Sequence, residues 1–539
     1  MAEMAKTDIV VIGGGIAGIT AALELMVTGK RIWILDRDEE TQFGGLAKEA
    51  FGGMALCGTP LQKLNGIKDD PELMLRDWLS FADFSPQDHW PRFWAESYCH
   101  RNNPDVYQWL KQQGLRFFPA VNWVERGEFL PGNSVPRYHI AWGTGWEMVR
   151  VLEARLRNHT NIANLRLCFQ HRVEDFVVQD GGVTGVIGIN EATGVPFEIE
   201  SEVVVVACGG INGNLEKVRQ HWPKDWGAAP ATILNGSHRY SDGLLHDAAG
   251  RIGANITHLD WQWNYAAGIH HPQPKMPLHG LSLIPPKSAL WMDANGRRVG
   301  PHPMVTGFDT HGLCQRVCHL PQGYTWQVMN RKIAHKEISI SGSEHNPAFR
   351  DKRPVTFARE ILLGNDNLYG YLVNECPDVI TADSLEELGA KMNAFDPDVT
   401  VDINGLVRDV RQYDSAIERG PALHNDDQLR RIEHARHWKG DKVRVLKFQK
   451  IEDPAAYPLV AIREFIISRK SMGGIQTDNH CRVLNMVGNP IDNLYAIGEA
   501  AGFGGGGANG NRSLEGTFLS ACVLTGRVAA RSIAGHTDP

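Results

Sequence analysis

The sequence lacks a strong excess of either charge, and it has no basic tail or stripe. Its 55 Lys and Arg residues stand against 62 Asp and Glu residues, which gives a formal net charge of −7. A nucleic-acid-binding surface needs clustered basic residues to offset phosphate charge. The basic stretch at residues 430–450 contains interleaved acids and is typical of a solvated helix face. The charge pattern therefore gives no support to a nucleic-acid partner.

Long apolar runs are also missing. A membrane-spanning helix needs roughly 18–20 consecutive apolar residues. The stretch at residues 9–27 comes nearest, but glycines interrupt it, and its period changes from that of a strand to that of a helix. A secretory signal needs one uninterrupted apolar segment and a small-residue cleavage site. We expect a soluble cytoplasmic protein without a membrane span.

The nine cysteines lack the spacing of a disulfide framework, and their number is odd. This pattern indicates free thiols in a reducing compartment. Cys314, Cys318 and His319 form the one local cluster, and no second ligand pair follows at the spacing of a zinc site. Chance proximity on one helix explains it better than a metal, so we expect none.

What is present is an ordinary globular composition on a long chain. Hydrophobic residues make up 42% and charged residues 22% of the 539 residues. This length favours two domains. The 15 tryptophans include several in residues 78–146. They would line an apolar pocket or, as is more common, fill the core and interfaces.

A dinucleotide-binding fingerprint opens the chain. Residues 7–12 form an apolar, β-branched run that predicts a buried parallel strand. Residues 13–18 fit the pattern G-x-G-x-x-G, and residues 19–27 continue as a helix. A second strand at 31–35 ends in Asp36. Strand, glycines, helix, strand and acid in this order predict a Rossmann-type βαβ unit.

Each part of the fingerprint has a physical task. Gly13 permits the tight turn, Gly15 allows a pyrophosphate to approach the backbone, and Gly18 permits close packing of helix and strand. The free N–H groups at the helix start then hold the anion. Asp36 would accept the ribose hydroxyls and disfavour a 2′-phosphate, which argues against NADP.

Three further segments distinguish FAD from NAD. A second glycine-rich loop spans residues 44–47 and continues to 51–53. A buried strand at 203–206 leads to Gly209 and Gly210, and a late strand at 493–497 leads to Gly498 and Glu499.

This set resembles the FAD-binding dehydrogenases of the fumarate reductase / 3-ketosteroid dehydrogenase superfamily, over almost the whole chain. Residues 134–145, 341–344 and 502–507 resemble a bacterial subgroup of ketosteroid-dehydrogenase-like members. The likeness implies an α/β fold: a Rossmann-like FAD-binding domain of the glutathione-reductase type, with an inserted α+β substrate or capping domain. We expect the first domain at 1–227 and 441–539, and the second at 228–440.

The resemblance also implies roles around the cofactor. Glu499 would bind the ribitol hydroxyls, and Val173 would meet the adenine. Relatives that attach flavin covalently carry a histidine where this chain has Leu46, so noncovalent FAD is expected. The residues expected to surround FAD are Gly13, Gly15, Ile16, Ala17, Gly18, Asp36, Arg37, Gly44, Gly45, Leu46, Ala47, Phe51, Gly52, Gly53, Val173, Ala207, Gly209, Gly210, Gly474, Gly498, Glu499, Arg512 and Leu514.

A final helix is expected at residues 514–534. Its N-terminus would face the flavin N1 and C2 carbonyl, where reduction places negative charge that a helix dipole stabilises. A flexible linker before a surface helix is the alternative interpretation.

Candidate catalytic cations follow from the same resemblance. Arg469 and Lys470 occupy the place of two histidines in the fumarate reductase stretch H-H-T-M-G-G, and Arg512 matches the family arginine that clamps a dicarboxylate. Cations there could bind a carboxylate or polarise a carbonyl oxygen. Alternatively, Arg512 pairs with Glu499 or Glu515, and Arg469 and Lys470 have a surface or FAD-phosphate role.

One departure argues against fumarate reduction. No arginine follows residues 295–299 until Arg316, whereas fumarate reductases carry a proton-donating arginine soon after the matching segment. Ketosteroid dehydrogenases instead use a tyrosine as base. Tyr138 is the candidate here and Tyr457 the reserve, although a buried structural tyrosine is the commoner case.

The sequence therefore predicts an FAD-dependent dehydrogenase. It would oxidise a carbon–carbon single bond beside a carbonyl, with hydride passing to flavin N5 and loss of the α proton. Two alternatives stay open: a flavin-dependent ene reductase of the fumarate reductase type, and a flavin-loaded electron-transfer or accessory subunit. The tryptophan-rich region favours a bulky, apolar small-molecule substrate. The sequence identifies neither the electron acceptor nor the oligomeric state.

Overall fold

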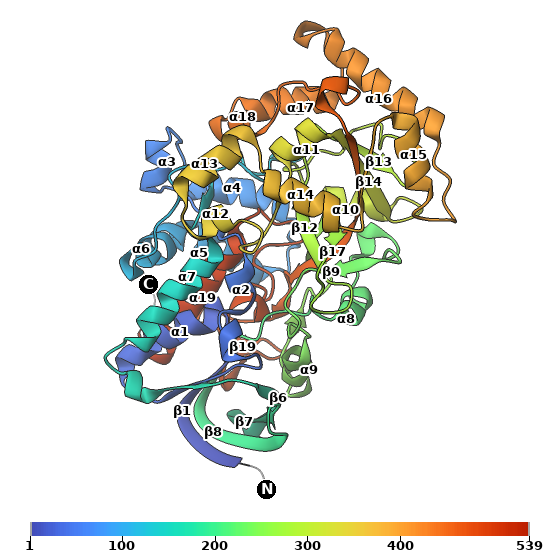
Figure 1. The fold of residues 1–539 in the computed structure, drawn as a ribbon. Helices are drawn as coiled ribbons and strands as arrows, with labels where there is room; N and C mark the ends of the chain where they lie inside the picture. Colours follow the sequence, from blue (N-terminus) through green and yellow to red (C-terminus); the bar gives the residue numbers. More distant parts are fainter. Residues whose placement is uncertain (1–2, 537–539) are drawn as a thin grey trace.

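A computed structural model describes residues 3–536 and contains two large β-sheets (Figure 1). The first sheet has the parallel order β20-β8-β1-β2-β5, and β19 pairs antiparallel with β20 at one edge. The antiparallel strands β6 and β7 extend it from β8. Its strands are β1 (Glu3–Ile12), β2 (Ile32–Leu35), β5 (Leu165–Cys168), β6 (His171–Gln179), β7 (Gly182–Asn190), β8 (Val195–Val206), β19 (Arg482–Leu484) and β20 (Pro490–Ala496).

The parallel centre of this sheet confirms the predicted dinucleotide-binding fold. Residues 9–12 of β1 are almost completely buried. Apolar side chains of helices pack on one face of the strand, and apolar side chains of β6 and β7 are part of the core on the other face. Val204 of β8 pairs with Leu494 of β20, so the diglycine strand and the late acidic strand share one sheet.

Three helices pack together against the first sheet: α1 (Ile16–Leu25), α7 (Thr144–Arg157) and α19 (Thr517–Ile533) (Figure 1). The last of these begins at Thr517 rather than at the expected residue 514, since Gly516 takes the left-handed conformation, φ 101°, at its N-cap. Residues 513–516 therefore lie in the turn before the helix.

The second sheet forms the centre of the capping region, in the order β13-β14-β17-β11-β12-β15, with β9 and β16 also paired to β17. Its strands are β9 (Ile233–Asn235), β11 (Gln262–His270), β12 (Gly280–Ile284), β13 (Leu290–Asp293), β14 (Tyr324–Asn330), β15 (Ser339–Ile340), β16 (Val379–Ala382) and β17 (Leu459–Ser471). Apolar residues of this sheet and of the helices above it form a separate core.

The remaining elements connect or cover these sheets. They are α2 (Gly45–Glu49), β3 (Gly53–Ala55), α3 (Pro60–Leu64), α4 (Pro71–Ala82), α5 (His89–Arg101), α6 (Trp109–Gln113), β4 (Tyr138–Ile140), α8 (Leu215–Gln220), α9 (Leu244–Arg251), β10 (Ile256–Thr257), α10 (Thr310–Cys318), α11 (Arg331–Glu337), α12 (Pro347–Arg350), α13 (Pro354–Leu363), α14 (Asp366–Glu375), α15 (Leu385–Asn393), α16 (Ile403–Glu418), α17 (Asp427–Arg436), α18 (Lys439–Arg444) and β18 (Gly474–Ile475).

Sheet pairing departs from the expected domain boundaries at two places. Strand β17 falls in the segment 441–539 that we assigned to the FAD-binding domain, yet it pairs with β11 and β14 of the second sheet. Helix α9 falls in the expected capping segment, yet Leu245, Ala248 and Ala249 pack into the core of the first sheet. Strand β17 and helix α9 thus connect the FAD-binding and capping regions. Their apolar residue patterns do not indicate which of the two sheets each would contact.

The structure also bears on the predicted lack of a membrane span and on the state of the cysteines. Within residues 3–536, no helix is both long and apolar enough to cross a membrane. All nine cysteines are free thiols. The Cys314–Cys318 cluster lies on α10, as predicted.

Candidate active site and cofactor cavity

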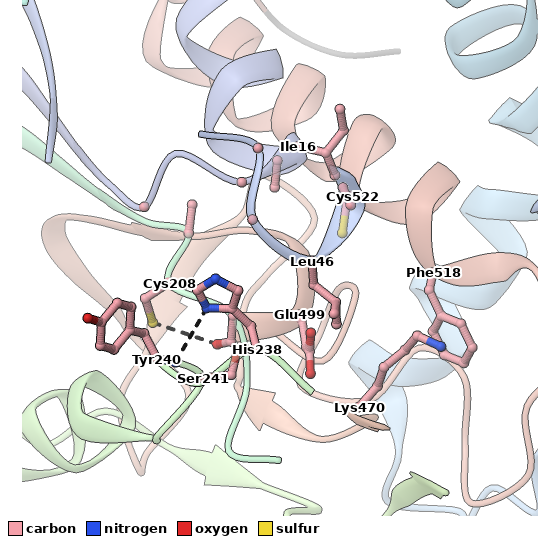
Figure 2. Close-up of a pocket in the computed structure, with 18 of the residues that line it drawn as sticks. Ile16, Leu46, Cys208, His238, Tyr240, Ser241, Lys470, Glu499, Phe518 and Cys522 are labelled. Atoms are coloured by element: carbon pink, nitrogen blue, oxygen red, sulfur yellow. Dashed lines mark hydrogen bonds between the residues drawn. The ribbon is translucent and has the colours of Figure 1, made fainter. Parts of the chain in front are cut away.

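A cavity lies at the carboxyl ends of the parallel strands, and residues at the start of α19 also line it; Figure 2 shows part of its lining. Ligands of open α/β sheets bind at this edge, because the loops that leave the strands there form a crevice. The predicted cofactor residues that line it are Gly13, Gly15, Ile16, Ala17, Asp36, Arg37, Gly44, Gly45, Leu46, Ala47, Phe51, Gly52, Gly53, Val173, Ala207, Gly209 and Glu499.

The glycine turn after β1 has the geometry that a pyrophosphate requires. A Cβ on Gly13, at φ 109°, would lie 2.4 Å from the carbonyl oxygen of Ala207, and one on Gly18 would lie 2.1 Å from the carbonyl oxygen of Gly13. Gly15 has no atom within 4 Å of such a Cβ, and for Gly45 the nearest is at 3.9 Å. The first two glycines are thus needed for packing, whereas the last two face open space.

The acid at the end of β2 lies beside this turn. Oδ2 of Asp36 accepts a hydrogen bond from the Gly14 N–H at 2.9 Å, and Oδ1 accepts one from the Asp38 N–H at 2.8 Å. Burial raises the pKa of Asp36, while these two N–H groups act in the opposite direction. The carboxylate is therefore held in a fixed orientation in the cavity wall.

Next to Asp36, Arg37 is held by residues that sequence reasoning did not identify. Its guanidinium lies 4.3 Å from the ring centroid of Tyr240 and forms ion pairs with Asp242 at 2.7 Å and Glu191 at 3.1 Å. Tyr240 and Asp242 also line the cavity. No local sequence signal indicates that these residues lie beside Arg37, because 205 residues separate it from Asp242 along the chain.

Glu499 lies farther along the cavity, just after β20 (Figure 2). Its Oε1 accepts a hydrogen bond from the Ser471 N–H at 2.9 Å. Burial raises the pKa of Glu499 to about 7, against the opposing effects of the Ser471 N–H and the Lys470 cation. The carboxyl group can thus change charge near neutral pH.

Lys470 comes from the end of β17, and its amine points along the ring of Phe518 (Figure 2). The amine nitrogen lies 4.3 Å from the ring centroid. In the described residues, no carboxylate lies within 4 Å of this nitrogen. Burial lowers the pKa of Lys470 to about 8, and the charge of Glu515 partly offsets this. Arg469 also lines the cavity and donates to the carbonyl oxygen of Gly236.

Tyr138, the candidate base, lies in the cavity wall on β4. A Cβ on Gly516 would lie 2.9 Å from its ring, so the ring packs closely on that backbone. Burial, and secondarily the charge of Glu515, raises the pKa of Tyr138. The reserve candidate Tyr457 does not line the cavity and lies in the charged surroundings of Glu452 and Asp414.

The cavity also contains a hydrogen-bonded pair that sequence reasoning missed. The hydroxyl of Tyr265 donates to Oε2 of Glu515 at 2.6 Å, and the indole N–H of Trp263 donates to the same oxygen at 3.1 Å. Tyr265 and Glu515 both line the cavity. No short motif could have identified them, because 250 residues separate the two in sequence.

The structure does not bring Arg512 to the cavity wall. Its guanidinium forms an ion pair with Asp309 at 2.6 Å, on the turn before α10. Neither of the anticipated pairings, with Glu499 or Glu515, is found within the described residues. Arg512 is therefore close in sequence to the cavity residues Glu515 and Gly516, but its guanidinium is paired with Asp309.

The other predicted cofactor residues that do not line the cavity lie behind its wall: Gly18, Gly210, Gly474, Gly498 and Leu514. A Cβ on Gly210 would lie 2.5 Å from Oε1 of Glu499, and one on Gly498 would lie 2.8 Å from the Cβ of Ala17. These positions shape the cavity without facing it.

The residues present fit an FAD molecule. Backbone N–H groups at the start of α1 suit a pyrophosphate, and two carboxyl groups of the lining, Asp36 and Glu499, suit two sets of hydroxyl groups. The open space at Gly15 and Gly45 leaves room for the phosphates.

Comparison with known proteins agrees with this fit. A family model described as FAD binding domain matches residues 8–519. A KsdD-like steroid dehydrogenase of Mycobacterium tuberculosis is 39% identical over 552 residues, which cover 99% of this chain and 96% of that protein. The chain therefore belongs to the FAD-binding flavoproteins, as a 3-ketosteroid-dehydrogenase-like member and an FAD-dependent oxidoreductase acting on CH–CH groups.

Two solved structures share the fold. The 3-ketosteroid Δ1-dehydrogenase from Sterolibacterium denitrificans, in complex with 1,4-androstadiene-3,17-dione, has a TM-score of 0.69 at 16% identity, covering 98% of this chain and 99% of that one. The 3-ketosteroid-Δ4-(5α)-dehydrogenase from Rhodococcus jostii, in complex with 4-androstene-3,17-dione, has a TM-score of 0.63 at 21% identity, covering 98% and 97%. The predicted fold class, FAD binding and dehydrogenase class are confirmed.

Proposed function

We propose that this protein is a dehydrogenase of a 3-ketosteroid or a similarly bulky, apolar ketone, and that it holds FAD noncovalently in a reducing cytoplasm. The observation that carries the proposal is a cavity that combines the FAD-binding turn with two half-buried cations and a hydrogen-bonded tyrosine–glutamate pair. The similarity to a KsdD-like steroid dehydrogenase along nearly the whole chain supports the substrate class.

Different residues of the chain would hold different parts of the cofactor. Gly13, Gly15 and the start of α1 would bind the pyrophosphate, Asp36 the ribose, and Glu499 the ribitol. Bound FAD supplies the two-electron oxidant that accepts a hydride. The N-terminus of α19, whose residues Gly516 and Phe518 line the cavity, would stabilise negative charge on the reduced ring.

Noncovalent attachment has a specific basis. Leu46 lines the cavity where covalent relatives are expected to carry histidine, and an alkyl side chain cannot form the bond. Acid precipitation should therefore leave all the yellow colour in the supernatant. Colour retained in the protein pellet would contradict this part of the proposal and point to another side chain in the wall.

Substrate activation would depend on the two cations after β17. The Lys470 ammonium would polarise a carbonyl oxygen, and Arg469 would orient the same end of the substrate. Tyr138 remains a candidate for the proton transfer because it lines the cavity. Arg512 keeps its predicted role as a substrate clamp only if substrate replaces Asp309 as its partner.

The experiment is anaerobic mixing of the purified yellow protein with 4-androstene-3,17-dione. We expect loss of the oxidised-flavin absorbance and a steroid product lighter by two hydrogen atoms in mass spectrometry. If a chemically reduced protein is instead reoxidised by a non-steroidal enone or enoate while no ketone reduces it, the enzyme is an ene reductase. If it reacts with neither, the accessory-subunit alternative is favoured.

A further inference from the structure

The contact between Tyr265 on β11 and Glu515 before α19 is the best-defined acid–base pair of the cavity. The Tyr265 hydroxyl donates to Oε2 of Glu515 at 2.6 Å, a short hydrogen bond between a phenol and a carboxyl oxygen. Trp263 fixes the same oxygen from a second side with an N–H at 3.1 Å. Trp263 is 1% exposed, which makes it a rigid support.

One cation of the cavity is electrostatically coupled to Glu515. Among the charged groups around Lys470, Glu515 has the largest effect in raising the pKa of its amine. Lys470 also lies 5.7 Å from the ring centroid of Tyr265. A carboxylate, a phenol and an ammonium group therefore meet at one end of the cofactor cavity.

The two tyrosines of the cavity differ in their ability to pass a proton on. Tyr138 has no hydrogen bond from its hydroxyl to another described residue, so a proton that it gained or lost would have no onward acceptor in the protein. Tyr265 has one, in Glu515. Burial and the neighbouring carboxylate keep the pKa of Tyr265 well above its usual range, which suits a neutral relay rather than a resting phenolate.

We propose that Glu515 is the general base of the dehydrogenation and that the Tyr265 hydroxyl relays the proton to it. This assignment rests on the function proposed above. The C–H bond beside the substrate carbonyl breaks, and its proton goes to Oη of Tyr265 while the hydroxyl proton passes to Oε2 of Glu515. The electron pair of that bond stays on the substrate and forms the new double bond as the hydride leaves for the bound oxidant.

The assignment is tested on the holoenzyme by hydrogen exchange, which does not require net oxidation. Enzyme with dithionite-reduced FAD is incubated under argon in D₂O with 4-androstene-3,17-dione, and deuterium uptake beside the carbonyl is followed by mass spectrometry. A protein-free sample gives the uncatalysed background. Steroid dissociation constants and bound-FAD content are measured on the same samples, because a purely structural role would change those values as well.

Tyr265→Phe and Glu515→Gln should each slow the exchange by about 10²-fold or more, the usual contribution of a positioned acid or base. Steroid affinity and FAD content should stay at wild-type values, and Glu515→Asp should restore part of the rate. The matched controls Tyr371→Phe and Glu375→Gln, both on α14 in the capping region, should exchange like the wild type.

Three outcomes would count against the assignment. Wild-type exchange in both Tyr265→Phe and Glu515→Gln would overturn it. So would a result in which Tyr138→Phe loses exchange while Tyr265→Phe exchanges like the wild type. If Glu515→Gln does not bind FAD, the exchange rate of Tyr265→Phe, which removes a single oxygen atom, tests the assignment alone. A wild-type enzyme that neither exchanges nor oxidises any 3-ketosteroid refutes the proposed function itself, and the base assignment with it.

Discussion

Gly210 lies directly behind Glu499, so closely that a Cβ at residue 210 would be 2.5 Å from Oε1 of the carboxyl group and 2.6 Å from Oγ of Ser471. The diglycine after β8 thus supports a cavity residue contributed by the strand at the opposite end of the chain. The approach depends on the missing side chain, because a methyl group there would displace the Ser471 hydroxyl or the Glu499 carboxyl group, which accepts a hydrogen bond from the Ser471 N–H at 2.9 Å.

Gly210→Ala should therefore weaken FAD binding. Displacing Glu499 removes a charged hydrogen-bonding group, which corresponds to about 1.5–3 kcal/mol, or about a 10- to 100-fold rise in the dissociation constant. Fluorescence titration of the FAD-free protein measures it. Gly250→Ala on α9 is the control, since the nearest atom to its Cβ is at 3.8 Å. Equal affinities in the two variants would contradict the role of Gly210.

Glu499 should make the FAD-free protein less stable as pH rises. Its pKa is raised from 4.5 in the unfolded chain to about 7 by burial, so the unfolded state loses this proton first. The stability it contributes is full below about pH 4.5 and is lost as pH rises through 7, by at most about 3 kcal/mol. Urea unfolding from pH 5 to 8 should show this decline relative to Glu499→Gln. Parallel curves for the two proteins would rule it out.

Lys470 should set an alkaline limit to activity. Burial lowers its pKa from 10.5 to about 8, so the cation that polarises the carbonyl is lost above that pH. For turnover of 4-androstene-3,17-dione, kcat/KM should fall above about pH 8 in the wild type. Lys470→Arg should move the fall to higher pH because arginine stays charged.

Lys470→Met should remove the alkaline fall altogether and lower the rate by about 10²–10³-fold, the typical cost of losing one oxyanion donor. Lys68→Met, at an exposed position before α4, serves as the control. A wild-type pH profile in Lys470→Met would show that the amine takes no part in the reaction.

Arg137→Ala should destabilise the fold rather than affect chemistry directly. The Arg137 side chain is fully buried and forms ion pairs with Asp69 at 2.8 Å and Asp77 at 2.5 Å. Removing one partner leaves two buried carboxylates uncompensated, at a cost of about 3–5 kcal/mol. Chemical denaturation checks this against Arg76→Ala, an exposed arginine of the same region. A loss no larger than that of the control would contradict the prediction.

Much of the cofactor site was predictable because its signals are local. The glycine turn, the helix and Asp36 lie within 30 residues, and each depends on backbone geometry that residue type controls directly. The catalytic roles of Tyr138, Arg469, Lys470 and Arg512 stay predictions. Arg512 was placed by a family match, but its charge is engaged by Asp309, and the position of Asp309 before α10 has no sequence signal.

The amino-acid sequence by itself determined that this chain folds around a dinucleotide at its N-terminus, because steric freedom at glycines and the order of strand and helix are properties of neighbouring residues. Only the tertiary structure decided that β17 joins the second sheet and that Tyr265 meets Glu515. Such contacts depend on packing between elements that are far apart in the sequence. Short-range sequence patterns do not specify which distant side chains come into contact.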